Sequence, residues 1–199
     1  MEINGFRFFP AAISTPLQIA LVEAVMAAAK TAPFYRPMTP SGKAMSVWQT
    51  GFGPLGWVTD RAGYRYEPRH PVTGSPWPRM PDILTELWDR YAGADRPPDA
   101  CLVNLYRQGA RMGLHQDADE ADFTVPVLSI SLGDTALFRL GGASRRDPTR
   151  TLRLASGDIC VLGGASRRAY HGIDRVLVGS SNLAPGGGRI NLTLRRAGA

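Results

Sequence analysis

The chain has 199 residues, 44% of them hydrophobic and 20% charged, so it can form one well-buried core and has the composition of a soluble globular protein. No apolar run approaches the ~18 residues of a membrane helix, and the first residues lack the charged and apolar regions of a signal peptide. The net charge is +6 and almost entirely arginine, since only Lys30 and Lys43 are lysines; this favours a polyanionic partner such as nucleic acid, although arginine bias can also reflect codon composition.

A first helix is expected from residue 15 to about residue 32. Thr15 would be its N-cap, Pro16 its first residue and Gln18 the reciprocal capping partner. Apolar residues then recur at helical spacing. The helix should therefore bury one face against a sheet.

The segment 33–81 is irregular and rich in aromatic residues, so it is not a disordered linker. Short strands are expected around 46–49 and 56–59. We expect Trp48 to lie in the core and His70 to lie in a surface loop. A second helix is expected over 81–91. Its apolar side comprises Leu84, Leu87, Trp88 and Tyr91.

After residue 98, short β-type runs alternate with glycine and aspartate turns. The expected strands are 101–106, 127–132, 136–140, 151–154, 158–162 and 189–195. Many short strands at this spacing indicate a sandwich or barrel, and a jelly roll is one such solution. Cys101 and Cys160 lie in apolar runs, which favours two buried thiols in a reducing, cytosolic protein. There is no internal repeat, so one domain is the simplest organisation.

Two of the three histidines fall on a metal-binding pattern. His115 stands two residues before Asp117, and His171 follows after about fifty residues. Residues i and i+2 of an extended strand point the same way, so His115 and Asp117 can reach one ion. Two histidines and one carboxylate form the facial triad that holds Fe(II) with open positions for a co-substrate and O2.

The strand 189–195 carries a second polar set. Arg189, Asn191, Thr193 and Arg195 share one face, opposite an apolar face. Guanidinium groups grip carboxylates with paired charge-assisted hydrogen bonds, so this face is a candidate dicarboxylate receiver. The alternative is an edge strand with a solvated polar face. Asn104 and Tyr106 share a face of strand 101–106 and can add neutral hydrogen bonds.

These motifs occur together in one order. The set comprises Asn104-Leu105-Tyr106, His115-Gln116-Asp117, Ser129-Ile130-Ser131-Leu132-Gly133, Gly163-Gly164, Tyr170-His171-Gly172 and Arg189-Ile190-Asn191-Leu192-Thr193-Leu194-Arg195. The chain resembles the AlkB family of Fe(II)- and 2-oxoglutarate-dependent dioxygenases, in its bacterial DNA-repair branch. The resemblance is close over about 98–196, and it extends upstream to Gly56-Trp57 and Pro76-Trp77-Pro78. Leu194, where related proteins often carry an aromatic residue, and the plain Gly186-Gly187-Gly188 loop depart from the family.

The resemblance implies an α+β, mainly β fold. It consists of a double-stranded β-helix (a jelly-roll, cupin-like core) braced by N-terminal helices, with a β-rich nucleotide-recognition lid. One dioxygenase domain would span 1–199, with helices and lid over about 1–97 and the catalytic core over about 98–196.

The resemblance also implies a role for each site residue. The iron ligands, and thus the catalytic residues, would be His115, Asp117 and His171. The residues that bind 2-oxoglutarate would be Asn104, Tyr106, Arg189, Asn191 and Arg195.

On the substrate side, Trp57 would stack on a flipped base against the ring of His115. Tyr64 and Tyr66 would face the DNA backbone, Asp119 would sit beside the exocyclic amine of the base, and Arg145 would lie at the pocket rim. Further arginines in turns near the site are candidates for phosphate contacts. They are Arg111, Arg146, Arg150, Arg167 and Arg168.

We therefore expect a monomeric, cytoplasmic dioxygenase that uses Fe(II), 2-oxoglutarate and O2 to demethylate bases such as 1-methyladenine and 3-methylcytosine in DNA. The substrate would be single-stranded or carry a flipped base. Alternatives are the same chemistry on methylated RNA or a protein side chain, and a non-catalytic cupin-like module that binds a metal and a small acid. A plain nucleic-acid-binding domain would leave the metal and arginine motifs unexplained.

Overall fold

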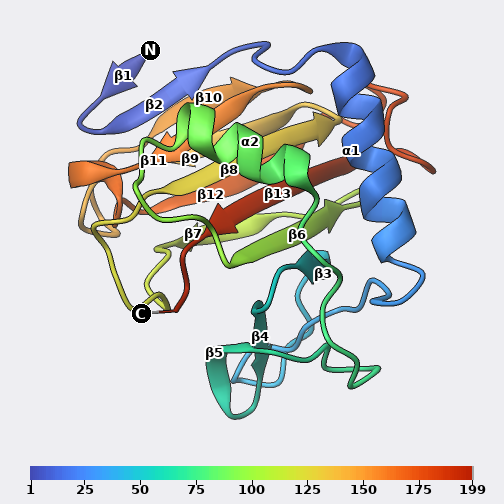
Figure 1. The fold of residues 1–199 in the computed structure, drawn as a ribbon. Coiled ribbons are helices and arrows are strands. Elements are labelled where there is room, and N and C mark those ends of the chain that lie inside the picture. Colours follow the sequence, from blue (N-terminus) through green and yellow to red (C-terminus); the bar gives the residue numbers. More distant parts are fainter. Residues whose placement is uncertain (199) are drawn as a thin grey trace.

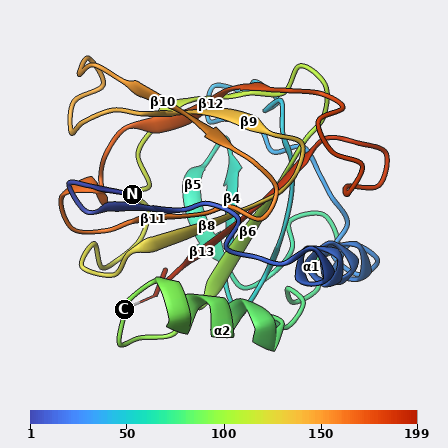
Figure 2. The ribbon, with the colours of Figure 1, turned by 90° about the horizontal axis from the view of Figure 1, so that it is seen from above.

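Two antiparallel sheets face each other and form the centre of the structure (Figure 1, Figure 2). The structure is a computed structural model that describes residues 1–198. The larger sheet contains, in spatial order, β1 (Glu2–Ile3), β2 (Phe6–Phe9), β11 (Ile159–Leu162), β8 (Val127–Gly133), β13 (Arg189–Arg195), β6 (Ala100–Tyr106) and β3 (Trp48–Phe52). The smaller sheet contains β10 (Arg150–Leu154), β9 (Ala136–Leu140), β12 (His171–Val176) and β7 (Met112–His115).

Strands β6, β8, β11 and β13 face the four strands of the smaller sheet and complete an eight-stranded jelly roll. The predicted fold class is therefore confirmed. The N-terminal part of the chain also contributes to the larger sheet, because β2 pairs with β11 and β3 pairs with β6. Among the described helices, none is long and apolar enough to cross a bilayer.

Two helices cover the outer face of the larger sheet (Figure 2). Helix α1 (Thr15–Ala28) is shorter than predicted, and its N-cap is Ser14 rather than Thr15. The side chain of Gln18 does not form the predicted capping box; its amide donates to the Ile13 carbonyl and its oxygen accepts from Ser156. Helix α2 (Asp82–Tyr91) buries Leu84, Leu87 and Trp88, as its amphipathic pattern predicts.

Apolar and polar side chains alternate along β13, so the strand presents one face to the apolar core and the other to the space between the sheets. Ile190, Leu192 and Leu194 point toward the helices and join the main apolar cluster, whereas the four alternate residues point between the sheets. Every residue of β13 is buried, because helices cover one face of the sheet and the smaller sheet covers the other. Each fully buried aliphatic side chain contributes about 1.5–3 kcal/mol. Both thiols, Cys101 and Cys160, are free and buried, as expected.

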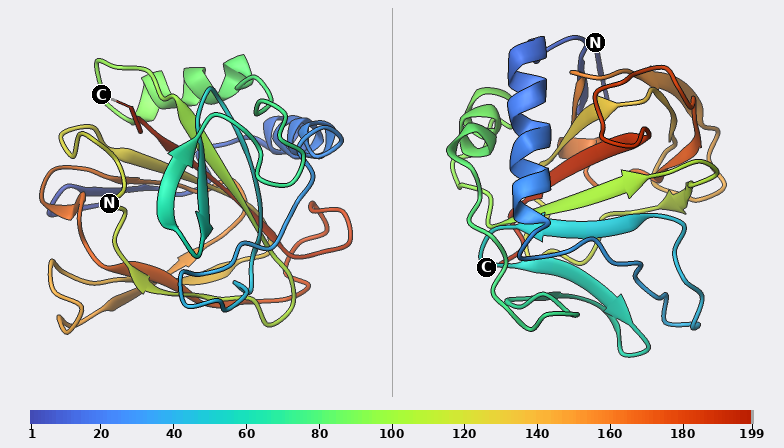
Figure 3. Two further views of the ribbon diagram at one scale, coloured as in Figure 1. Left: turned by 90° about the horizontal axis from the view of Figure 1, so that it is seen from below. Right: turned by 90° about the vertical axis from the view of Figure 1, so that its right-hand side faces the viewer.

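A two-stranded hairpin of β4 (Gly56–Asp60) and β5 (Gly63–Glu67) stands apart from both sheets (Figure 1, Figure 3). Its turn is closed by Asp60, which accepts from the Ala62 backbone, and by Gly63 at φ +112°. Trp77 packs so closely on Gly56 that a Cβ there would lie 2.2 Å from the indole ring. This contact fixes the base of the hairpin.

His70 supports the same segment from within, so the expectation of a surface histidine was wrong. The residue is 1% exposed, and its Nε2 lies 2.9 Å from the Pro33 carbonyl. Its ring meets Tyr35 and Trp77 edge-on at 5.3 and 5.0 Å between centroids. Burial lowers the pKa of His70, so a neutral imidazole fits this apolar setting.

Candidate metal centre and co-substrate pocket

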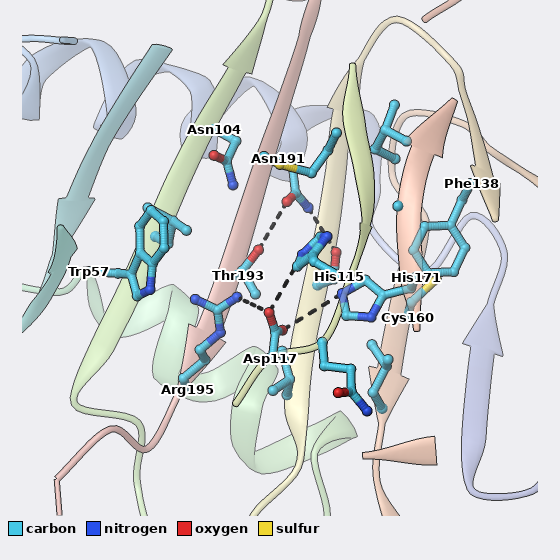
Figure 4. Close-up of a pocket in the computed structure, with 18 of the residues that line it drawn as sticks. Trp57, Asn104, His115, Asp117, Phe138, Cys160, His171, Asn191, Thr193 and Arg195 are labelled. Carbon is cyan, nitrogen blue, oxygen red and sulfur yellow. Dashed lines mark hydrogen bonds and ion pairs between the residues drawn. The ribbon is translucent and has the colours of Figure 1, made fainter. Parts of the chain in front are cut away.

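His115, Asp117 and His171 meet at one point between the sheets (Figure 4). His115 ends β7 and His171 begins β12, and the two are direct cross-strand partners. Their Nε2 atoms lie 3.7 and 3.9 Å from the two carboxylate oxygens of Asp117, and all three ligand atoms lie within 4.8 Å of one another. Asp117 lies beyond the end of β7 rather than in one strand with His115.

Backbone carbonyls orient both imidazole rings. Nδ1 of His115 lies 2.9 Å from the Gly113 carbonyl, and Nδ1 of His171 lies 2.9 Å from the Ala169 carbonyl. A proton on each Nδ1 leaves the lone pair of each Nε2 for a metal, which is how metal-binding histidines are held. Two nitrogens and one carboxylate on one side of the site fit Fe(II) with open positions.

The protonation states suit metal binding. Burial, with the neighbouring His115, lowers the pKa of His171 to about 4, so this ring is neutral at pH 7. Burial alone would raise the pKa of Asp117, but Arg195 and the two imidazoles outweigh it and hold that pKa well below its usual range. The site therefore offers a neutral nitrogen of His171 and the anionic carboxylate of Asp117.

The shift at His171 predicts how the metal-free protein responds to acid. An unfolded histidine takes up a proton near pH 6.5, whereas folded His171 resists until about pH 4, so the unfolded state binds more protons in this window. As the pH is lowered from 6.5 to 4, the free energy of unfolding should therefore decrease by up to about 3 kcal/mol, at 1.36 kcal/mol per pKa unit. Denaturant unfolding in chelator at pH 7 and pH 5 would measure about 2 kcal/mol of this loss, which belongs to the 1.5 pH units below 6.5. A His171→Gln variant should lose this part of the pH dependence, and an unchanged slope would contradict the assignment.

Arg189 is the strongest candidate for holding an anion. The residue is 1% exposed, and its Nη2 donates to Ser131 at 2.9 Å. Among the described residues, nothing accepts from its Nε or Nη1. The guanidinium also stands 5.3 Å from the centre of the Tyr106 ring. A buried cation with unpaired donors is costly, so these donors fit a carboxylate of a small acid.

Arg195 occupies the metal end of the same pocket. Its Nη2 lies 2.8 Å from Oδ1 of Asp117, so it contacts a metal ligand as well as lining the cavity. The structure therefore brings the two predicted arginines to different parts of the cavity. Asn191 lies between them on β13, and its amide nitrogen donates to the Ser129 hydroxyl and to the Ile130 carbonyl of β8.

Gln49 was missed by the sequence reasoning. It is 1% exposed on β3, opposite Asn104, and its Nε2 donates to the Asn104 side-chain oxygen at 2.8 Å. With its oxygen occupied, Asn104 presents its amide nitrogen to the cavity, which suits an anionic ligand. Trp48, expected in the core, is 40% exposed. The prediction for β3 was therefore wrong about which residues face inward: Gln49 is buried and Trp48 is exposed.

At the mouth, Trp57 and Tyr64 of the hairpin stack with centroids 5.5 Å apart and planes at 18°. The Trp57 indole donates to Asp119 at 2.7 Å. All three residues line the cavity, which has a volume of about 270 Å³. Tyr66 differs from the expectation, because its hydroxyl donates to Glu120 inside the protein at 2.6 Å. Arg145 lies in the exposed turn between β9 and β10, outside the residues that line this cavity.

A jelly roll that holds a facial triad beside a buried carboxylate receiver defines an iron-dependent oxygenase that consumes a 2-oxo acid. A family model described as the 2OG-Fe(II) oxygenase superfamily matches residues 5–195. A Caulobacter vibrioides (strain NA1000 / CB15N) protein named alpha-ketoglutarate-dependent dioxygenase AlkB homolog is 62% identical over 195 residues, which cover 98% of this chain and 89% of that protein. Escherichia coli (strain K12) AlkB is 46% identical over 182 residues, covering 89% and 84%.

A solved structure, OsALKBH1, superposes with a TM-score of 0.80 at 28% identity and covers 98% of this chain and 99% of that one. The chain therefore belongs to the 2OG-Fe(II) oxygenase superfamily and, within it, to the AlkB family. It is a dioxygenase whose cofactors are Fe(II), 2-oxoglutarate and O2. The alternative of an inert binding module is thereby set aside.

Proposed function

We propose that this dioxygenase removes methyl groups from N-alkylated bases in DNA. The observation that carries the proposal is the stacked pair of Trp57 and Tyr64 at the mouth of the metal pocket. Aromatic faces of this kind bind nucleic-acid bases whatever their sequence. More distant relatives are named for such substrates: a DNA N(6)-methyladenine demethylase of Arabidopsis thaliana and a tRNA demethylase of Schizosaccharomyces pombe.

The reaction balances with the co-substrate. Iron, when bound, supplies the activation of O2 for this oxidation. One oxygen atom enters succinate as 2-oxoglutarate loses CO2, and the other enters a C–H bond of the N-methyl group. The resulting N-hydroxymethyl group releases formaldehyde, and the N–C electrons remain on the base nitrogen. Two electrons come from 2-oxoglutarate and two from the methyl group, which together reduce O2.

The residues of the chain supply binding and orientation. His115, Asp117 and His171 would hold the metal, and Arg189 would hold a carboxylate of 2-oxoglutarate. One carboxylate oxygen of Asp119 accepts a hydrogen bond from the Trp57 indole. Its second oxygen has no partner among the described residues and can accept from the exocyclic amine of a base.

The substrate must present its base outside a stack. A cavity between two sheets cannot admit a paired base, so the nucleotide is flipped or single-stranded, at a cost of about a few kcal/mol that is lowest for a lesion unable to pair. A cationic methylated base would also be attracted to the aromatic pair and to the Asp119 carboxylate. Tyr64, which lines the mouth of the cavity, and Arg145, in the exposed turn between β9 and β10, are proposed contacts to the substrate strand.

The experiment that tests this function compares DNA and RNA oligonucleotides of one sequence, each with one N1-methyladenine. With Fe(II), 2-oxoglutarate and air, the DNA should yield formaldehyde and succinate in equal amounts. Formaldehyde from RNA alone would move the substrate to RNA. Succinate without formaldehyde from either oligonucleotide would contradict base demethylation and favour a protein side chain.

Replacing Trp57 with alanine should slow demethylation at limiting substrate by roughly 5- to 150-fold, since stacking contributes about 1–3 kcal/mol per base. Decay of 2-oxoglutarate without substrate should change little. Trp48→Ala is the matched control, because Trp48 is an exposed tryptophan on β3 that does not line the cavity. Equal losses in both variants would remove the stacking role.

We also propose that the protein acts as a monomer and that it works in the cytoplasm. One chain supplies the proposed metal ligands, carboxylate-binding residues and base-stacking residues, so a monomer would hold a complete site. The two buried free thiols fit a reducing compartment such as the cytoplasm.

A further inference from the structure

A buried cluster of charges lies directly behind the metal centre. Arg167, Glu120, Arg195 and Asp117 are 3%, 6%, 7% and 8% exposed. Arg167 was expected to contact phosphates from a surface turn, which its burial contradicts. Glu120 was not among the residues predicted from the sequence, and no contact among these four residues was predicted. The cost of removing such charges from water is offset only by close partners and added hydrogen bonds.

Glu120 is the centre of this cluster. Its Oε2 accepts from Nη2 of Arg167 at 2.9 Å, and its Oε1 lies 3.3 Å from Nε of Arg195. Oε1 also accepts from the Tyr66 hydroxyl at 2.6 Å. One carboxylate thus joins Arg167, the pocket arginine Arg195 and the hairpin strand β5.

Arg167 fixes the loop that carries Glu120. Its Nη1 donates to the Asp117 carbonyl at 2.8 Å and its Nε to the Val125 carbonyl at 2.8 Å. The backbone of a metal ligand and the side chain of Glu120 are therefore held by the same guanidinium. The loop from Asp117 to Val125 is braced at both ends.

The guanidinium group of Arg195 is planar, so a contact that fixes one edge of the group also fixes the orientation of the other edge. Its Nε forms an ion pair with Glu120 but no hydrogen bond among the described residues, and its Nη2 contacts Asp117. Its Nη1 lies 3.5 Å from the Tyr66 hydroxyl. The orientation of this guanidinium in the pocket thus depends on Glu120 and on a hydroxyl that belongs to the hairpin. Burial raises the pKa of Tyr66, so the hydroxyl remains a donor.

We propose that Glu120 is a positioning residue that holds Arg195 for the co-substrate, and that the Tyr66 hydroxyl transmits the position of the β4–β5 hairpin to this contact. Trp57 lies opposite Tyr66 in the hairpin register. A base that stacks on Trp57, under the proposed function, therefore fixes the hairpin strand that supports Arg195. Base binding and 2-oxoglutarate binding should consequently strengthen each other by the same factor.

The test uses Tyr66→Phe, which keeps the ring and removes only the hydroxyl. Titration calorimetry of 2-oxoglutarate under anaerobic conditions on Fe(II)-loaded protein would give its Kd, with and without a methylated single-stranded DNA. The variant should bind 2-oxoglutarate about fivefold or more weakly without DNA, and the tightening that DNA causes in the wild type, about fivefold or more, should disappear. Glu120→Gln should weaken 2-oxoglutarate in the same way.

Tyr91→Phe is the matched control, because the Tyr91 hydroxyl also donates a hydrogen bond, to the Ala12 carbonyl, but lies on α2 away from the cavity. The double variant Tyr66→Phe/Glu120→Gln should be no weaker than Glu120→Gln alone, since both act through one contact. Additive losses, or a wild-type Kd in Tyr66→Phe, would overturn the proposal. If the wild type fails to bind methylated DNA while Tyr66→Phe still weakens 2-oxoglutarate, the DNA substrate is wrong but the positioning role stands.

Discussion

Alanine at position 117 is expected to abolish stoichiometric Fe(II) binding and, with it, turnover. Asp117 supplies the only anionic ligand of the triad and lies within 4 Å of both ligand nitrogens, at 3.7 and 3.9 Å. Loss of a group that merely orients a ligand costs roughly 10–100-fold in metal affinity, so loss of the ligand itself should cost more. Anaerobic Fe(II) titration with elemental analysis would measure the stoichiometry.

Asp174→Ala is the control for that experiment. Asp174 lies three residues after His171 on β12 but is exposed, so its loss should leave Fe(II) binding unchanged. Retention of one tightly bound Fe(II) by Asp117→Ala would contradict the ligand set. Loss of iron by both variants would point to a general defect in β12 and its neighbours.

Methionine at position 189 is expected to weaken 2-oxoglutarate binding and to stabilise the ligand-free protein. Removing one partner of a buried, hydrogen-bonded charge pair costs about 2–5 kcal/mol, so the affinity should fall by roughly 30- to 5,000-fold. Without ligand, however, Arg189 is a buried cation whose Nε and Nη1 have no acceptor within residues 1–198. An apolar side chain of similar length removes this uncompensated charge, and replacements of this kind are often stabilising.

Calorimetric titration and thermal denaturation in chelator would measure the two effects on one sample. Arg175→Met, an exposed arginine on β12, should change neither the affinity nor the melting temperature appreciably. A lower melting temperature in Arg189→Met would mean that the guanidinium is already satisfied in the empty pocket. An unchanged affinity would remove Arg189 from the co-substrate site.

The two-residue alternation of β13 was sufficient to predict both its apolar face and its polar face, because both sides of this strand are covered and the pattern has only one consistent phase. The pairing of His115 with His171 could not be predicted in this way, because the strands that carry them, β7 and β12, were not among the strands expected from the sequence. Spacing alone could not place Asp117, which lies past the end of β7 and is held there by Arg167.

Edge strands and loops were harder to predict. The phase of β3 is set by its register with β6, which places Gln49 opposite Asn104 and leaves Trp48 outside. Nothing in the local sequence distinguishes the two phases. Likewise, Arg167 and His70 lie in turns whose sequences predict exposure to solvent, but contacts from distant segments bury each of them. Such contacts become visible only in three dimensions.

The central claim is that the triad oxidises the methyl group of a base at the expense of 2-oxoglutarate. It is tested most directly by mass spectrometry of a single-stranded DNA that carries one N1-methyladenine, after incubation with protein, Fe(II), 2-oxoglutarate and air. We predict that the oligonucleotide loses one methyl group, that the loss requires 2-oxoglutarate, and that His171→Ala abolishes it. An unchanged oligonucleotide while 2-oxoglutarate is consumed, or demethylation that persists in His171→Ala, would contradict the claim.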